Sequence, residues 1–191
     1  MIIEERMKTK IYRVLIVLFC LIMAPCVQAD GIVIKHASSK LVDDVYQLDA
    51  KLEFNFDPEM IDALEHGISF SIDINVLIKR KRKWLWDPKV REDTLSFRLE
   101  QHPLSNRYLV TNLNNNNTRQ FQTLGDALDF LGTIHNYNLV SRNVLSRDEK
   151  YICMIKADLN TETLPPAIRP IAAVSKKWRL DSPWYEWHLD K

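Results

Sequence analysis

The sequence predicts a mainly β fold, an antiparallel β-sandwich-like single domain with two short helices. Several segments alternate apolar and polar residues with a period of two, which is typical of strands that bury one face. Turn-forming Asn, Pro and Gly residues separate these segments, and only two stretches show helical signals. A chain of 191 residues fits one domain.

The first alternating segment covers residues 46–56 and predicts a strand. Asp57 and Pro58 follow as a helix N-cap and first helical residue, and Gly67 closes a short helix. Alternation then resumes at residues 68–78, so a second strand should follow the helix directly.

Three further strands are predicted at residues 95–99, 108–113 and 118–122, because polar turns separate these apolar alternations. The apolar spacing over residues 123–134 predicts the second helix. Residues 151–157 are apolar on both faces, which favours an interior strand, and alternation returns at residues 185–189. These segments make about seven strands.

The N-terminal residues have the pattern of an export signal. Four cations precede an unbroken apolar run over residues 14–23, and Val27 and Ala29 form a small-x-small cleavage site. We therefore expect a signal peptide over residues 1–29, cleavage near Ala29, and a single exported β-rich domain over residues 30–191, in the periplasm or otherwise exported. The alternative is a retained N-terminal membrane anchor, although the uncharged stretch is shorter than the roughly 20 residues that span a bilayer.

Charge and cysteine content narrow the possible functions. The chain has 26 Lys and Arg against 25 Asp and Glu, a balance that argues against a nucleic-acid binder. Cys20 and Cys26 would leave with the signal peptide. Cys153 then cannot form an internal disulfide, and its apolar strand predicts a buried, inert thiol.

The sequence shows no motif of a known catalytic chemistry. There is no nucleophile elbow, phosphate loop or zinc-protease helix motif, and no two of the five His residues lie within four residues of each other. We therefore expect a protein that is not an enzyme, with no metal and no cofactor. An enzyme with a dispersed site is the least favoured alternative.

A basic-aromatic run over residues 79–86 is the strongest candidate binding site. Its members are Lys79, Arg80, Lys81, Arg82, Lys83, Trp84 and Trp86. Such a run can bind an acidic protein, lipid phosphates or a polyanionic glycan; it can also be a charged strand edge that prevents aggregation. Residues 68–86 would reach about 60 Å as one strand, so the chain must bulge, bend or project near the run.

Two groups of tryptophans extend this hypothesis. Trp84 and Trp86 have the same parity as Ile78, so both would face the core if the strand stayed extended. Near the C-terminus, Trp187 should be a core residue. Trp184 lies on the opposite face, either covering the sandwich or forming an exposed contact, and we include it among the candidate binding residues.

Short segments in a particular order resemble the domain of unknown function family 4390, a set of exported proteobacterial proteins. They are Asp49-Ala50-Lys51-Leu52, Ala63-Leu64, Gly67-Ile68, Lys83-Trp84-Leu85-Trp86-Asp87, Arg98-Leu99, His102-Pro103-Leu104-Ser105, Tyr108, Thr123-Leu124, Ala127-Leu128, Ser175, Trp178, Ser182, Trp184 and Trp187. Leu85 departs from the pattern, which has an aromatic residue there. The resemblance implies export and a link to a membrane sensor kinase, but no activity.

Together these features predict a non-catalytic exported accessory module of the cell envelope that binds a protein partner, an envelope or membrane protein. The alternative is a module that binds a glycan or anionic lipid headgroups through residues 79–86. No nucleic-acid partner is expected. The two hypotheses differ in the class of ligand: a protein in the first, and a glycan or lipid surface in the second.

Overall fold

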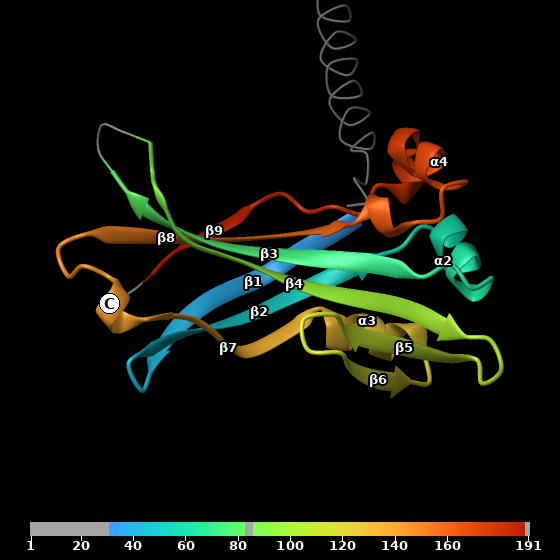
Figure 1. Ribbon diagram of the computed structural model, residues 1–191, viewed down its shortest axis with the longest axis horizontal. Helices are drawn as coiled ribbons and strands as arrows, with labels where there is room; N and C mark the ends of the chain where they lie inside the picture. The colour runs from blue at the N-terminus through green and yellow to red at the C-terminus, as the bar shows by residue number, and fades with distance from the viewer. Residues whose placement is uncertain (1–30, 83–85, 190–191) are drawn as a thin grey trace, which may run out of the picture.

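The computed structural model describes residues 31–82 and 86–189, so the predicted signal peptide lies outside the described residues. Two antiparallel sheets of three and six strands form a sandwich, which confirms the predicted fold class (Figure 1). Within the described residues no helix combines the length and the apolar character needed to cross a membrane.

The smaller sheet has the order β1-β2-β7. It consists of β1 (Gly31–Val42), β2 (Val45–Asn55) and β7 (Thr133–Ser141). Asp43 and Asp44 connect β1 to β2 in a tight turn, with φ angles of 47° and 61°. The sequence predicted β2 but neither of its neighbours.

The larger sheet has the order β6-β5-β4-β3-β8-β9. Its strands are β3 (Phe70–Lys81), β4 (Lys89–His102), β5 (Arg107–Asn112), β6 (Asn117–Phe121), β8 (Lys150–Leu159) and β9 (Tyr185–His188). All six correspond to predicted strands. The two longest, β3 and β4, are neighbours and form one extended hairpin.

Two helices of eight residues match the predicted pair. In α2 (Pro58–Glu65), the Asp57 side chain accepts a hydrogen bond from the Glu59 amide, and Thr123 caps α3 (Leu124–Leu131) in the same way. A third helix, α4 (Arg169–Val174), was not predicted. Single 3-10 turns are η1 (Arg142–Val144), η2 (Thr161–Thr163) and η3 (Lys176–Trp178).

The second helix is shorter than predicted, because Gly132 redirects the chain. The Leu52 amide donates a hydrogen bond to the Gly132 carbonyl at 2.7 Å. A Cβ atom at Gly132 would lie 2.2 Å from the Leu52 carbonyl oxygen, so only glycine permits this approach. Ile134, assigned to the helix from its spacing, is instead a buried residue of β7.

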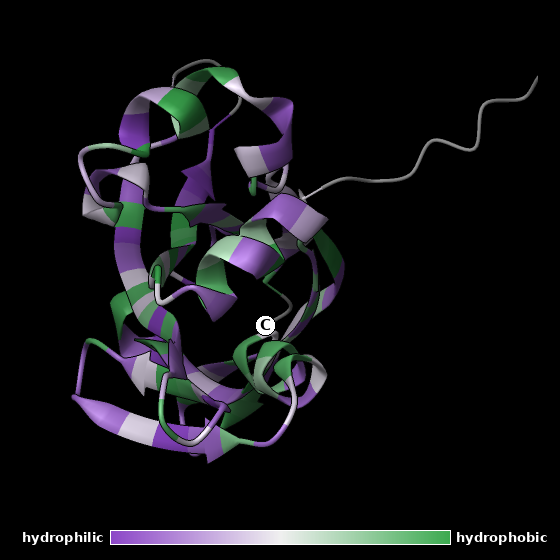
Figure 2. Ribbon diagram, turned by 90° about the vertical axis from the view of Figure 1, so that its right-hand side faces the viewer, coloured by the Kyte–Doolittle hydropathy of each residue, from purple (hydrophilic) through white to green (hydrophobic). Residues whose placement is uncertain are grey.

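Alternating side chains of β3 form the centre of the core. Ile72, Ile74, Val76 and Ile78 are at most 3% exposed. Figure 2 shows the alternation as green and purple bands along the strands. On β8, Cys153 is fully buried, and this burial raises the pKa of its thiol to about 12, in agreement with the predicted inert role.

Residues near the C-terminus join the two sheets. The Ile32 amide of β1 donates a hydrogen bond to the Asp181 carbonyl at 3.3 Å. The Trp187 indole donates to the Ser39 hydroxyl at 3.1 Å and packs half-buried against the core, as predicted. The first described residues of the chain are therefore held beside its last segment.

Candidate binding surface on the β3–β4 hairpin

The basic-aromatic run lies where β3 turns back into β4. The Arg80 amide donates a hydrogen bond to the Pro88 carbonyl at 3.1 Å, and the Arg82 amide donates to the Asp87 carboxylate at 2.7 Å. The end of the hairpin projects beyond the sandwich, as the length of the segment predicted (Figure 1). Lys83 and Trp84 belong to the predicted site but lie outside the described residues.

Trp86 is 95% exposed, so the core position that an extended strand would have given it is not realised. The prediction assumed an extended strand through residue 86, whereas β3 ends at Lys81. Parity with Ile78 carries no information after the chain turns. An exposed indole at a projecting turn is available for contact with another molecule.

Arg80 differs from the other cations of the run. Its guanidinium donates two hydrogen bonds to the Glu149 carboxylate, at 2.9 and 3.0 Å, and its side chain is only 28% exposed. Glu149 also accepts a hydrogen bond from the Tyr151 hydroxyl at 3.3 Å. Arg80 therefore supports the base of the hairpin and is not free to bind a partner.

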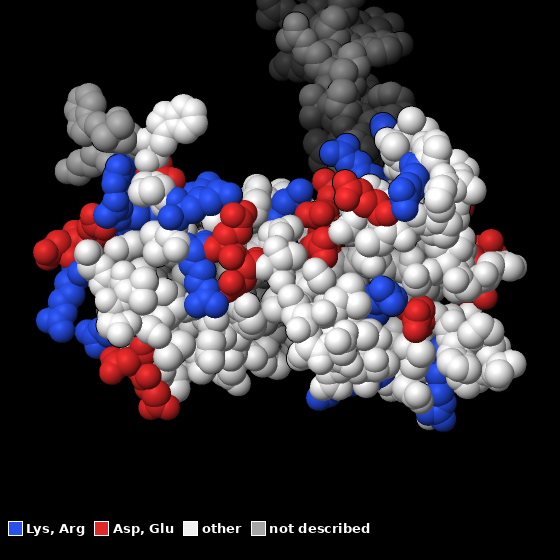
Figure 3. Space-filling view, in the orientation of Figure 1, with Lys and Arg blue, Asp and Glu red and all other residues white. Residues whose placement is uncertain are grey.

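Lys81 and Arg82 are exposed and form no ion pair with any described residue. Cations further along β4 are compensated, since Lys89 pairs with Glu92 at 2.8 Å and Arg91 with Asp93 at 2.7 Å. Figure 3 shows blue side chains at this end of the molecule, with red ones among them. We refer to Lys81, Arg82 and Trp86 as the hairpin tip.

Trp184, the remaining predicted site residue, lies away from the hairpin tip. It is 43% exposed and directly precedes Tyr185, which pairs with Ile155 of β8. This register places Trp184 near the level of Asn75 on β3. Asn75 lies six residues before Lys81, which corresponds to about 20 Å along the strand. Lys79, by contrast, is half-buried within β3 and adjoins the tip.

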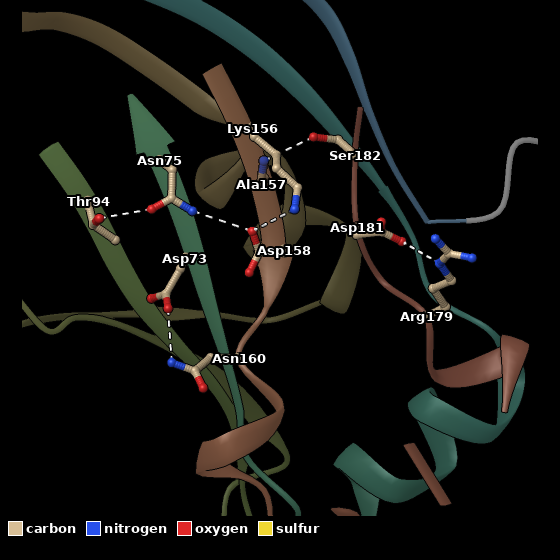
Figure 4. A network of polar contacts seen from close by, with 10 residues as sticks. All are labelled: Asp73, Asn75, Thr94, Lys156, Ala157, Asp158, Asn160, Arg179, Asp181 and Ser182. Carbon is tan, nitrogen blue, oxygen red and sulfur yellow. Dashed lines mark hydrogen bonds and ion pairs between the residues drawn. The ribbon is translucent and has the colours of Figure 1, made fainter. Parts of the chain in front are cut away.

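A polar network covers the outer face of the six-stranded sheet (Figure 4). The Asp73 carboxylate accepts hydrogen bonds from the Ser96 hydroxyl at 2.6 Å and from the Asn160 amide at 2.9 Å. The Asp158 carboxylate accepts one from Asn75 at 3.4 Å and pairs with Lys156 at 3.5 Å. Each carboxylate therefore has hydrogen-bond or ion-pair partners. The contacts that join different strands hold β3, β4 and β8 together.

Within residues 31–82 and 86–189, no three His, Cys, Asp or Glu side chains are arranged to hold a metal ion. Sequence reasoning missed one more feature, an exposed apolar segment around α4 that includes Ile171 and Val174.

The comparisons with known proteins identify the family. Residues 29–188 match the family described as domain of unknown function (DUF4390). No curated protein and no solved structure shows significant similarity to the chain. The match includes the hairpin, both sheets and α4, and its extent shows that the chain belongs to the DUF4390 family.

Proposed function

We propose that the protein is a non-catalytic accessory module of the cell envelope, which binds an acidic surface of a partner protein through the hairpin tip. The observation that supports this most strongly is the exposure of Trp86, at 95%, beside two cations that form no ion pair with a described residue. Tryptophan and arginine are the residues most enriched in binding hot spots.

The base of the hairpin favours specific binding. Backbone hydrogen bonds run along the β3–β4 ladder, and the Arg80–Glu149 pair fixes β3 to the segment preceding β8. Binding through a fixed element loses less conformational entropy than binding through a flexible tail. Uncompensated cations also accelerate association with an acidic surface and orient the encounter.

Photo-crosslinking in living cells tests this proposal. A photoreactive residue at position 86 should give a protein adduct, and the same residue at Leu104, which is 94% exposed, should not. Arg82→Glu should reduce the adduct at position 86 at least about tenfold, because it reverses a charge in the contact. Arg98→Glu provides the matched charge reversal at an exposed β4 position distant from the tip.

The controls separate binding from folding. Arg82→Glu and Arg98→Glu should each change the free energy of unfolding by less than about 0.5 kcal/mol, because both side chains are exposed. Arg80 is unsuitable for this test, since its substitution leaves Glu149 without its cation. Equal adducts at positions 86 and 104, or an adduct unaffected by Arg82→Glu, would refute the proposal.

The same observation favours one second candidate, binding of anionic lipid headgroups or a polyanionic glycan. Tryptophan and cations also occur together where proteins contact membranes. In that case position 86 gives no protein adduct, while anionic vesicles or envelope glycans retain the wild-type protein and release the Arg82→Glu variant.

A further inference from the structure

A segment at the other end of the sandwich exposes apolar side chains almost without interruption. Residues 164–174 contain one charged residue, Arg169. Leu164 and Ala172 are buried and attach the segment to the core. Ile168 is half-buried and packs against the core, and the other positions are exposed, with Ile171 50% and Val174 85% exposed. The exposed apolar members, which we call the α4 patch, are Pro165, Pro166, Ala167, Pro170, Ile171, Ala173 and Val174.

Cations border the α4 patch. Lys176, Lys177 and Arg179 follow it directly and are all exposed. Lys177 pairs with Glu59 and Arg179 with Asp181, each at 3.1 Å. Lys176 and Arg169 form no ion pair with any described residue. The surface therefore combines aliphatic side chains with two cations, Lys176 and Arg169, that no described carboxylate pairs with.

The described chain begins beside this surface. Gly31 lines the same recess as Lys176, Lys177 and Arg179. The apolar run at residues 14–23 ends eight residues before Gly31, which is a reach of at most about 29 Å. While that run occupies a membrane, as a signal or as an anchor, the α4 end of the domain is consequently held near the bilayer.

We propose that the α4 patch docks the domain onto the surface of an anionic lipid bilayer. Aliphatic side chains can enter the boundary between headgroups and acyl chains, while bordering lysines approach anionic headgroups. The aromatic residue here, Trp178, is buried, and its indole donates to Glu59 at 2.9 Å.

This orientation is compatible with the proposed function without depending on it. Figure 1 shows the β3–β4 hairpin and α4 rising from the same side of the sandwich, at opposite ends of its long axis. A domain that rests on lipid through α4 would present the hairpin tip to a partner in or near the same membrane.

A fluorescent label at position 174 tests the docking. Cys153 is buried, so a new cysteine in a Cys20→Ser, Cys26→Ser chain can be labelled selectively. An environment-sensitive probe on Val174→Cys should shift to the blue with vesicles containing phosphatidylglycerol, and its intensity should rise at least about twofold. The same probe on Val144→Cys, a 62% exposed valine in η1, should not respond.

Substitutions then show which side chains contact the vesicles. Ile171→Asp with Val174→Asp should lower partitioning onto these vesicles about tenfold, because two aliphatic side chains lose their burial. Added salt should weaken binding, and neutral phosphatidylcholine vesicles should bind less. Trp86→Ala should leave partitioning unchanged. No change in the fluorescence of the probe at position 174 overturns the inference, and so does partitioning that depends on Trp86 instead of Ile171. The crosslink at position 86 tests the proposed function separately.

Discussion

At the scale of single residues, a tryptophan lowers the pKa of a carboxyl group in the first turn of α2. Glu59 accepts hydrogen bonds from the Trp178 indole at 2.9 Å and from the Lys177 ammonium at 3.1 Å. The Trp178 hydrogen bond, followed by the contact with Lys177, lowers the pKa of Glu59. These contacts connect α2 to η3, at the margin of the α4 patch.

Trp178→Phe should keep the aromatic packing, including the edge-to-face contact with Phe70, whose ring centroid lies 5.9 Å from that of Trp178. It should remove the indole N–H that donates to Glu59. We expect the pKa of Glu59 to rise toward its ordinary value of 4.5, as measured by NMR titration of the carboxyl carbon. Since the folded pKa lies below the unfolded value, this stabilisation is fully present above pH 4.5 and lost as the pH falls through the folded pKa.

Lys177→Met is the control for this titration, because it removes only the second, more exposed donor. It should also raise the pKa of Glu59, because the hydrogen bond and the charge of Lys177 both lower it. An unchanged pKa in the Trp178→Phe variant would mean that the indole does not stabilise the Glu59 carboxylate in solution.

Individual residues also show what a sequence can specify. Cys153 was predicted correctly, because an apolar run on both faces of a strand implies burial. The cations of the basic run appeared equivalent in the sequence. In the structure, only Arg80 among the described members pairs with Glu149, which lies 69 residues further along the chain. Long-range pairing of this kind leaves no local signal, so the sequence could not distinguish Arg80 from the other cations of the run.

At the scale of elements, the junction between α3 and β7 depends on one glycine. Gly132→Ala places a methyl group on the Leu52 carbonyl, a backbone atom that cannot move without disturbing β2. We expect a loss of at least about 2 kcal/mol in the free energy of unfolding, measured by chemical denaturation. A loss below about 0.5 kcal/mol would show that the junction relaxes.

Gly125→Ala is the matched control within the same helix. Its nearest neighbour, the Thr123 hydroxyl oxygen, would lie 3.8 Å from the new Cβ atom, which is ordinary contact. Alanine should therefore stabilise α3, by about 0.5–1 kcal/mol, because it restricts the unfolded chain. The two substitutions are expected to differ in sign, which separates helix propensity from steric conflict.

The two strands that the sequence did not predict, β1 and β7, are those in which the period of two is interrupted. The β1–β2 register shifts between Ile34 and His36, and the β2–β7 register shifts twice. In β7, Asn136 also takes a φ of 52°. Each irregularity moves the following side chains to the other face, so a period of two does not persist. The regular ladder of β3 explains why that strand was recognised.

At the scale of the molecule, the sequence predicted the sandwich and a bulge, bend or projection near the basic run, because periodicity and strand length are local properties. It did not predict the surface around α4. That surface is assembled by a bridge between Asp158 and Asp181 and by the contact of Ile32 with Asp181. Such contacts depend on the topology of the complete fold.

The thiols of the protein can be used to measure both its processing and its global stability. Cleavage near Ala29 would remove Cys20 and Cys26 and leave Cys153, whose pKa of about 12 and complete burial keep it from forming a thiolate. We therefore expect no reaction with a thiol reagent in the native protein and one reactive thiol per chain in denaturant.

Three reactive thiols in denaturant would instead mean that the N-terminal segment is retained as an anchor, and intact mass would locate the first residue. Because Cys153 lies at the centre of β8 among core residues, its native-state labelling rate should follow global unfolding. Gly132→Ala should accelerate labelling in proportion to its loss of stability, whereas Arg82→Glu should not. Rapid native labelling of wild-type protein would show that β8 opens locally and that the two sheets do not unfold as one unit.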